Sequence, residues 1–283
     1  MRTIGICAKV IAPEAVDFSR EIAKELQGRG FEIALDPATA EALDLERVHI
    51  HEKPDLGAHA DLLITFGGDG TLLSVARHAP ESVPVIGVNM GTLGFLTEIR
   101  VEELRSLLDG VISGHYRSEE RVAFEVHVGN ETYRVLNDAV INKSALARII
   151  EMKVTVGDQF VSNFRADGLI ISTPTGSTAY NLSAGGPIIY PTMNAVVLTP
   201  ICPHMLTNRP VVLPDVLPIS IEVVTPNQEV FVTLDGQEGV PLIDHQRVVV
   251  QRSPQSVKLV LSPTKNYFDV LRSKLKWGEG GED

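Results

Sequence analysis

Basic residues are scarce in this chain of 283 amino acids. Its 25 lysines and arginines stand against 36 aspartates and glutamates, which gives a formal net charge of -11. Because nucleic acids and anionic membranes bind proteins through basic surfaces, this balance argues against broad binding to either partner. A small phosphate ligand is still compatible with it, since a short loop of backbone amides binds phosphate without changing the overall charge.

Cysteines and long apolar segments are also few. The two cysteines, Cys7 and Cys202, are isolated, and the sequence contains no C-x-x-C pair. Two isolated thiols do not make a disulfide framework, so we expect a reduced, cytoplasmic setting. We find no secretory signal and no apolar run of about 18 residues that would span a membrane.

The two commonest nucleotide-binding motifs are missing as well. The pattern G-x-x-x-x-G-K-[ST] does not occur, which excludes a P-loop enzyme. No G-x-G-x-x-G follows a strand-like run, which argues against a Rossmann dehydrogenase.

The chain does contain an alternation of strands and helices over its first 120 residues. Strand-like runs cover residues 3–10, 31–35, 61–66 and 83–89, and helical patterns cover residues 13–27, 71–78 and 101–111. In the first helical pattern, Ala15, Ile22 and Leu26 recur at helical spacing. Such alternation is typical of a parallel sheet covered by helices, so residues 1–120 are predicted to form an α/β domain with a parallel sheet.

The pattern changes near residue 120. From residue 121 to about residue 260, short strand-like runs follow one another and are separated by turn residues. One of these predicted strands runs from Tyr133 to Asn142. Residues 121–260 are therefore predicted to form an all-β C-terminal domain, followed by a C-terminal segment over residues 261–283.

The strongest local signal is the run Gly-Gly-Asp-Gly-Thr at residues 67–71, after an apolar strand and before a helix. Glycines let the backbone approach a phosphate closely, and the amides and dipole of the following helix attract an anion. Asp69 would then be a base or a metal partner at a site built for anions. The alternative is a structural turn in which Asp69 caps the helix.

A second signal is the run from Asp167 to Pro187, where a strand ends in hydroxyls, small residues and glycines. Such a loop suits a sugar or a phosphate, and Tyr180 would stack on a ring. The alternative is a polar hairpin without a ligand.

Two polar interruptions lie in apolar surroundings: Asn137-Asp138 within a predicted strand, and Asp235-Gly236-Gln237 after another. Because Asp-Gly is a common hairpin turn, the second interruption has a purely structural explanation too.

Together these pieces resemble the NAD kinase family. Further matching runs are Gly87–Gly91, Leu93–Leu96, Leu136–Asp138 and Pro200–His204, and all of them occur in the family's order along most of the chain. Phe66 stands where the family often has Leu, and Asp138 where Glu is also common.

The resemblance implies an NAD kinase-like two-domain fold and an enzyme that transfers the γ-phosphate of ATP to the 2′-hydroxyl of the adenosine ribose of NAD, giving NADP. It places NAD in the cleft between the domains, with the C-terminal segment returning to the first domain. A divalent metal, Mg²⁺, would arrive with ATP. The family also suggests a homo-oligomer, either a dimer or a tetramer, with no nucleic-acid or membrane partner.

By matching position, Asp69 is the candidate catalytic residue. Whether it acts as a base, orients the hydroxyl or holds the metal is left open. The residues that match family ligand contacts are Gly67, Gly68, Gly70, Thr71, Asn137, Asp138, Arg148, Arg165, Asp167, Thr178, Ala179, Tyr180, Asn181, Ser183 and Gln237.

Two other functions compete with this interpretation. Lipid kinases carry a similar Gly-Gly-Asp-Gly element, although the hydroxyl-rich run at residues 173–180 and the absence of an evident membrane-binding face argue against one. A non-catalytic NAD-binding regulator would keep the β-domain pocket but would not need Asp69.

Overall fold

The computed structural model describes residues 1–144, 149–205, 207–224 and 229–277. The chain divides into two compact units. Unit 1 comprises Met1–Glu120 and Val257–Asp283, and unit 2 comprises Arg121–Ser256.

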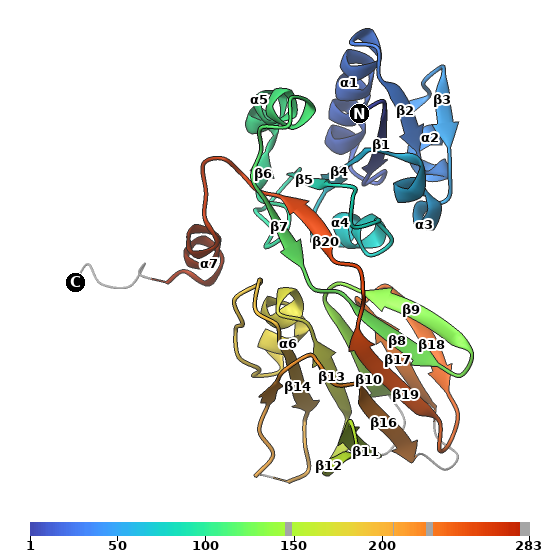
Figure 1. Cartoon of the computed structure of the whole chain (residues 1–283), viewed down its shortest axis with the longest axis vertical. Helices are drawn as coiled ribbons and strands as arrows, with labels where there is room; N and C mark the ends of the chain where they lie inside the picture. Colours follow the sequence, from blue (N-terminus) through green and yellow to red (C-terminus); the bar gives the residue numbers. More distant parts are fainter. Residues whose placement is uncertain (145–148, 206, 225–228, 278–283) are drawn as a thin grey trace, which may run out of the picture. The chain divides into compact units, whose positions relative to one another are not determined.

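Unit 1 is built on an 8-stranded sheet with the order β3-β2-β1-β4-β5-β20-β7, and β6 pairs with β5 beside this path (Figure 1). The strands are β1 (Thr3–Ala8), β2 (Glu32–Leu35), β3 (Val48–Ile50), β4 (Leu62–Gly67), β5 (Val85–Asn89), β6 (Ile99–Arg100), β7 (Ser118–Arg121) and β20 (Val257–Val260). The pairs β1–β2, β2–β3, β1–β4, β4–β5, β5–β20 and β5–β6 are parallel.

Helices cover both faces of this sheet. The helices of unit 1 are α1 (Pro13–Gly28), α2 (Pro37–Leu43), α3 (Lys53–Leu56), the 3-10 turn η1 (Gly57–His59), α4 (Asp69–Ala76), α5 (Val101–Ile112) and, near the C-terminus, α7 (Tyr267–Leu275). On one face Ile64 and Phe66 share a core with Ile22 of α1 and Leu104 of α5. On the other face, the space above Gly87 is filled by Leu72 of α4. All six residues of β4 are buried, as expected for a central parallel strand.

The strand order contains a reversal between β1 and β4. From β1 the chain moves outward to β2 and β3, and it then returns to the other side of β1 to form β4. At such a switch point the chain segments that follow the two neighbouring strands run to opposite sides. The carboxyl ends of these strands therefore border a crevice, which is where open α/β sheets bind ligands. The loops after β1 and β4, residues 9–12 and 67–71, lie at this crevice.

Unit 2 contains two 6-stranded sheets, with the orders β15-β14-β13-β10-β17-β18 and β12-β11-β16-β19-β8-β9. The strands of the first sheet are β10 (Asp138–Lys143), β13 (Gly168–Ser172), β14 (Val196–Ile201), β15 (Val211–Leu213), β17 (Val230–Leu234) and β18 (Glu238–Leu242). Those of the second are β8 (Phe124–Val128), β9 (Glu131–Val135), β11 (Ile150–Val156), β12 (Gln159–Ala166), β16 (Ile219–Val224) and β19 (Arg247–Arg252). All of the described pairs are antiparallel, and both sheets contribute to one apolar core.

The predicted fold class, an α/β domain followed by an all-β domain, is confirmed. Two details differ from the sequence-based expectation. β20 covers residues 257–260, which we assigned to the β-rich region, but it pairs with β5 in unit 1. The predicted strand Tyr133–Asn142 is two strands, β9 and β10, in different sheets. The chain changes sheets at Leu136 and Asn137, because the Asn137 carbonyl accepts a hydrogen bond from the Thr173 amide rather than continuing the β8–β9 ladder.

The hydroxyl-rich run after β13, described above as a loop, is partly helical. It forms a 3-10 turn, η2 (Thr175–Thr178), and a short helix, α6 (Tyr180–Ser183).

Candidate functional site

The glycine-rich loop of unit 1 joins β4 to α4. Gly68 is the N-cap residue of α4 and has an extended backbone, and Asp69 opens the helix. A side chain at Gly67 would collide with the Thr71 hydroxyl, so this position needs glycine for Thr71 to pack over the end of the strand. The loop therefore presents the N-terminus of an α-helix at the sheet's switch point, which is a favourable position for an anion.

The Asp69 carboxylate does not cap its own helix. Its Oδ2 accepts a hydrogen bond from the Phe95 amide at 2.8 Å. Its Oδ1 accepts three, from the Leu96 amide at 3.1 Å and from the Thr97 amide and hydroxyl, each at 2.9 Å. Asp69 thus fastens the loop after β5 to the glycine-rich loop. A side chain at Gly94 would collide with Asp69 Oδ1, which explains the glycine in the run Leu93–Leu96.

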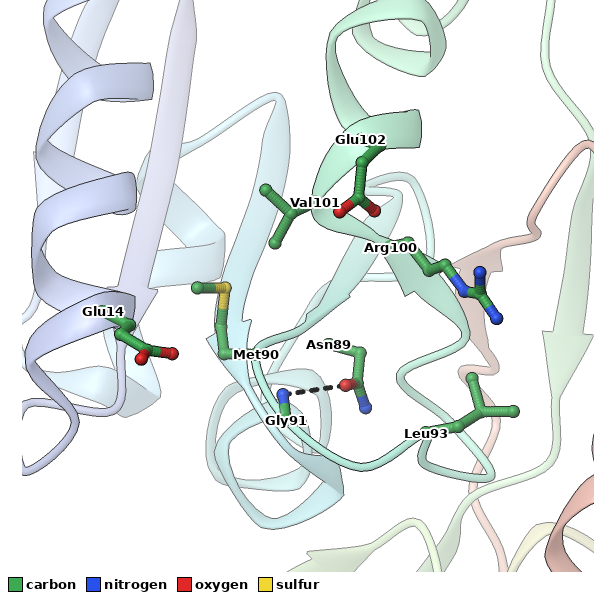
Figure 2. Close-up of a pocket in the computed structure, with 8 residues that line it drawn as sticks. All are labelled: Glu14, Asn89, Met90, Gly91, Leu93, Arg100, Val101 and Glu102. Atoms are coloured by element: carbon green, nitrogen blue, oxygen red, sulfur yellow. Dashed lines mark hydrogen bonds between the residues drawn. The ribbon is translucent and has the colours of Figure 1, made fainter.

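The other side of the loop after β5 borders a hollow of about 520 Å³ (Figure 2). Within the loop, the Asn89 amide nitrogen donates to the Thr92 carbonyl at 2.7 Å, and the Asn89 amide oxygen accepts from the Gly91 amide at 2.9 Å. Glu14 and Glu102 face this hollow from the first turns of α1 and α5. The Arg100 side chain also lines it, so two carboxylates and one guanidinium face the hollow and the balance disfavours a phosphate.

A second hollow in unit 1, of about 400 Å³, lies at the switch point between β1 and β4. It brings together three predicted residues, Gly68, Gly70 and Thr71. It also contains residues that the sequence did not single out: Ala8, Lys9, Val10, Ile11, Lys53 and Ser74.

Unit 2 has a pocket of about 240 Å³ above β10 and β17. Four of the predicted residues line it together: Asn137, Asp138, Ala179 and Tyr180. Its other lining residues are Val140, Asn142, Thr233, Asp235 and Gly236. The Asn137 and Asp138 side chains come from the start of β10, and Tyr180 comes from the first residue of α6.

The Asn137 segment is held from two sides. Asp235 accepts hydrogen bonds from the amides of Leu136, Asn137 and Asp138, at 2.7 to 3.1 Å. Thr173 donates its amide to the Asn137 carbonyl and its hydroxyl to the Leu136 carbonyl. Asp235 and Gly236 have positive φ angles of 49° and 67°, so the expected Asp-Gly turn is present as well.

Two polar groups of this pocket indicate a ligand. The amide oxygen of Asn137 is buried and has no hydrogen-bond partner among the residues that the structure describes. A buried acceptor without a partner costs free energy, so a ligand that donates to it gains affinity. Burial, and after it the charge of Asp235, raises the pKa of the Asp138 carboxyl to about 7.

The raised pKa of Asp138 predicts a pH-dependent stability. Between about pH 4 and pH 7 the folded protein binds more protons than the unfolded chain, so this group lowers the free energy of unfolding as the pH rises through that window. We expect Asp138→Asn to gain stability relative to the wild type from pH 4 to pH 7, by a few kcal/mol. Urea unfolding of both proteins at pH 4 and at pH 7 measures this difference in the free energy of unfolding. Asp158→Asn, an exposed carboxyl in a turn, is the control, and equal profiles for Asp138→Asn and the control would contradict the assignment.

The remaining predicted residues of unit 2 lie outside this pocket's lining. Asn181 is fully buried, and its amide bonds to the Ser177 and Pro187 carbonyls and to the Thr199 hydroxyl, so this side chain holds the loop together. The Thr178 hydroxyl donates to the Thr175 carbonyl.

Five predicted contacts of unit 2 remain, and the four that the structure describes lie on or near its surface. Asp167 is 3.6 Å from the Lys143 ammonium group. Arg165, Ser183 and Gln237 are exposed. Arg148 lies outside the described residues.

The two-residue period of a β-strand predicts some of the residues that line the pocket of unit 2 and that the sequence analysis did not single out. Side chains two residues apart on a strand share a face, so Asp138 predicts Val140 and Asn142 on the same side of β10. Thr233 lies opposite Val140 in the β10–β17 ladder, and its hydroxyl donates to the Asn142 amide oxygen at 3.3 Å. Only the strand pairing reveals Thr233.

Metal-ligand clusters and membrane-spanning helices are both absent from the described part of the chain. Residues 1–144, 149–205, 207–224 and 229–277 contain no group of three or more His, Cys, Asp or Glu side chains that would hold a metal ion. Within the same residues, no helix is long and apolar enough to cross a membrane.

Two family models match the chain. The model of the ATP-NAD kinase N-terminal domain matches residues 4–116, and the model of the ATP-NAD kinase C-terminal domain matches residues 136–262.

Curated relatives match over nearly the whole length. The NAD kinase of Syntrophotalea carbinolica is 48% identical over 286 residues, which cover 99% of this chain and 100% of the relative. The NAD kinase of Geotalea daltonii is 46% identical over 285 residues, with the same coverage.

Solved structures show the same architecture. The crystal structure of yeast NADH kinase complexed with NADH has a TM-score of 0.87 and 26% identity, and the match covers 100% of this chain and 89% of that one. An NAD kinase from Archaeoglobus fulgidus in complex with ATP has a TM-score of 0.76 and 24% identity, covers 96% and 99% of the two chains, and supports the fold alone.

Proposed function

Since the chain belongs to the NAD kinase family, we propose that it transfers the γ-phosphate of ATP to the 2′-hydroxyl of the adenosine ribose of NAD, forming NADP. The observation that carries this function is the match of both family domains, which together span residues 4–116 and 136–262. The geometry supports it, because unit 1 has a phosphate loop and unit 2 has a pocket with an unpaired amide acceptor.

We assign the adenosine part of NAD to the pocket of unit 2. The Asn137 amide oxygen accepts from the exocyclic amine of adenine, which satisfies its unpaired position. Asp138 pairs with a ribose hydroxyl, and the half-exposed ring of Tyr180 covers the base. The remaining family contacts in this unit, Arg148, Arg165, Asp167, Thr178, Ser183 and Gln237, stay assigned to the rest of the dinucleotide. Asn181 acts by holding the loop that carries Tyr180.

The ATP phosphates bind at the glycine-rich loop of unit 1. The backbone of Gly67, Gly68 and Gly70 allows the phosphates to approach α4, and Thr71 adds a hydroxyl. Phosphoryl transfer needs positioning and charge stabilisation more than covalent chemistry, and this loop supplies both.

Asp69 is the catalytic residue of this proposal. Three of its four hydrogen bonds end on Oδ1 and one on Oδ2, so Oδ2 keeps a lone pair for the 2′-hydroxyl. As the ribose oxygen forms its bond to the γ-phosphorus, its proton passes to Asp69. The bond from that phosphorus to the bridging oxygen of ADP breaks, and ADP leaves.

The residues fit a metal that arrives with ATP better than a metal held by the protein. The described residues offer no cluster of three metal ligands, and Asp69 is the one carboxylate in the glycine-rich loop. Mg²⁺ typically binds through substrate phosphates, one or two carboxylates and water, and it would offset the charge of the phosphates here. The ATP phosphates and water would hold it, because the free lone pair of Asp69 Oδ2 is assigned to the 2′-hydroxyl.

Two further proposals follow from the family and from the sequence. We propose that the active form is a homo-oligomer, a dimer or a tetramer, which sedimentation at assay concentration tests. We propose a cytoplasmic location, in line with the two free cysteines.

NADP formation from Mg-ATP and NAD tests the function itself. A lipid kinase would phosphorylate diacylglycerol or sphingosine and leave NAD unchanged. A non-catalytic regulator would bind NAD and form no product.

A further inference from the structure

The loop after β5 is fastened at its far end to a segment near the C-terminus. This segment, residues 261–266, joins β20 to α7 and is called the α7 linker below. The Ser262 amide donates to the Glu98 carboxylate at 2.7 Å, and the Lys265 ammonium group donates to the Glu98 carbonyl at 2.8 Å. All of these residues belong to unit 1, so the contacts join its two stretches of sequence.

These contacts are shielded from water. Ser262 and Glu98 are buried, and the Lys265 side chain is only 16% exposed. The Lys265 ammonium group also lies 3.9 Å from the Glu103 carboxylate, whose side chain is 17% exposed. Because a charge taken out of water needs close partners, and the Glu98 carbonyl is the nearest one, this hydrogen bond holds the lysine and the loop firmly together.

The α7 linker holds the chain on the other side of β6 as well. The Glu103 carboxylate accepts the Arg100 amide at 3.0 Å and so caps the first turn of α5. The same carboxylate accepts hydrogen bonds from the hydroxyls of Ser262 and Thr264. The end of the loop after β5 and the start of α5 are therefore both fixed by one short segment.

The fixed end of the loop lies next to the residues that hold Asp69. The amides of Phe95, Leu96 and Thr97 donate to the Asp69 carboxylate, and Glu98 is the next residue in the chain. A shift of the Glu98 carbonyl would move the neighbouring peptide groups, because consecutive Cα atoms are rigidly about 3.8 Å apart. Four hydrogen bonds would carry that shift to the carboxylate.

We propose that Lys265 is a positioning residue for phosphoryl transfer: by holding the Glu98 carbonyl, it keeps the loop after β5, and through it the Asp69 carboxylate, in the reactive position. The proposal rests on the proposed kinase function and on Asp69 as its catalytic residue. A catalytic group has to be held within about 0.5 Å of its productive position, which loops achieve only with support from their neighbours. The α7 linker supplies that support from a part of the sequence that follows all of unit 2.

Lys265→Met in the full chain tests the proposal first. Methionine keeps most of the apolar stem and removes the ammonium group. A charge-assisted hydrogen bond is worth about tenfold or more, so we expect kcat to fall about tenfold. The KM values for NAD and for Mg-ATP should stay within about twofold, because Lys265 positions the catalytic group and binds neither substrate in this proposal.

Three further variants separate positioning from folding. Lys265→Arg keeps a charged donor and should lose less turnover than Lys265→Met. Lys24→Met removes an exposed lysine of α1 and should leave every constant unchanged. Lys265→Gln also removes the ammonium group but stays polar, and it replaces Lys265→Met if that variant does not fold.

A double-mutant cycle shows whether Lys265 acts through Asp69. In an Asp69→Asn background the carboxylate that Lys265 positions is already gone, so adding Lys265→Met should change the residual turnover by no more than about twofold. A general structural role of Lys265 would lower turnover about tenfold in both backgrounds. That result would overturn the proposal.

Hydrogen exchange gives a readout that needs no turnover. In Lys265→Met the amides of residues 95–97 should exchange at least about tenfold faster than in the wild type, and those of β1 should keep their rate. Unchanged exchange at residues 95–97 together with an unchanged kcat would also overturn the positioning role. If exchange rises as expected but the wild type forms no NADP, Lys265 still holds the loop and the NAD kinase function fails.

Discussion

Asp69→Asn is expected to lower turnover with saturating NAD and Mg-ATP by at least about 10²-fold, the usual contribution of a positioned base. Asparagine keeps the size of the side chain, and its amide oxygen can still accept from the Leu96 and Thr97 amides. The amide nitrogen would face the Phe95 amide, so one hydrogen bond of the loop is lost. The affinity for NAD should change less than turnover, because the adenosine pocket lies in unit 2.

Thr97→Val is the matched control for this variant. It removes the hydrogen bond from the Thr97 hydroxyl to Asp69 and a long one, 3.4 Å, from the Asn89 amide to that hydroxyl, and it leaves the carboxylate in place. A loss of about tenfold or less is expected, as for one good hydrogen bond and one long, weak one. NADP formation and calorimetric NAD affinity are measured for both variants. If Asp69→Asn and Thr97→Val lose turnover equally, Asp69 only fastens the loop after β5, and the catalytic assignment is wrong.

Gly94→Ala is expected to have an effect of similar size, for a steric reason. The added methyl group would collide with Asp69 Oδ1 and with the Thr97 hydroxyl. The Thr97 hydroxyl donates a hydrogen bond to the Asp69 carboxylate, so neither group can move away from the methyl group without breaking the hydrogen bonds that hold the carboxylate. We expect turnover to fall by about 10²-fold or more, since a misplaced catalytic group by itself has a cost of this order.

Gly91→Ala provides the control in the same loop. A methyl group at Gly91 meets nothing within 4 Å, and its φ angle is not in the left-handed region. This variant should keep turnover within about threefold, as expected for a substitution without a steric conflict. Thermal unfolding of both variants shows whether they are folded. Near-normal turnover of a folded Gly94→Ala variant would show that the contact with Asp69 has no role in catalysis.

The sequence predicted the parts of the site that local chemistry defines. The Gly-Gly-Asp-Gly-Thr run lies at a strand-to-helix turn as expected, because glycines after an apolar strand leave few alternatives. Asn137, Asp138 and Tyr180 meet in one pocket, as their polar or aromatic character in apolar surroundings suggested.

What the sequence did not predict depends on contacts between distant segments. The partners of the Asp69 carboxylate are 26 to 28 residues away, so its role in holding the loop after β5 has no local signal. Lys9 and Lys53 come together only through the strand order that places β4 next to β1. The switch of the chain between two sheets at Asn137 depends in the same way on Thr173 and Asp235.

One measurement tests the kinase function most directly. The protein is incubated with Mg-ATP whose non-bridging γ-phosphate oxygens carry ¹⁸O, together with equal concentrations of NAD and dispersed diacylglycerol, and all products are analysed by mass spectrometry. We predict that NADP forms and keeps every heavy oxygen of the transferred group, because the ribose oxygen attacks the γ-phosphorus and the bridging oxygen leaves with ADP. Heavy oxygen found in a phosphorylated lipid or only in inorganic phosphate, with NAD unchanged, would contradict the account.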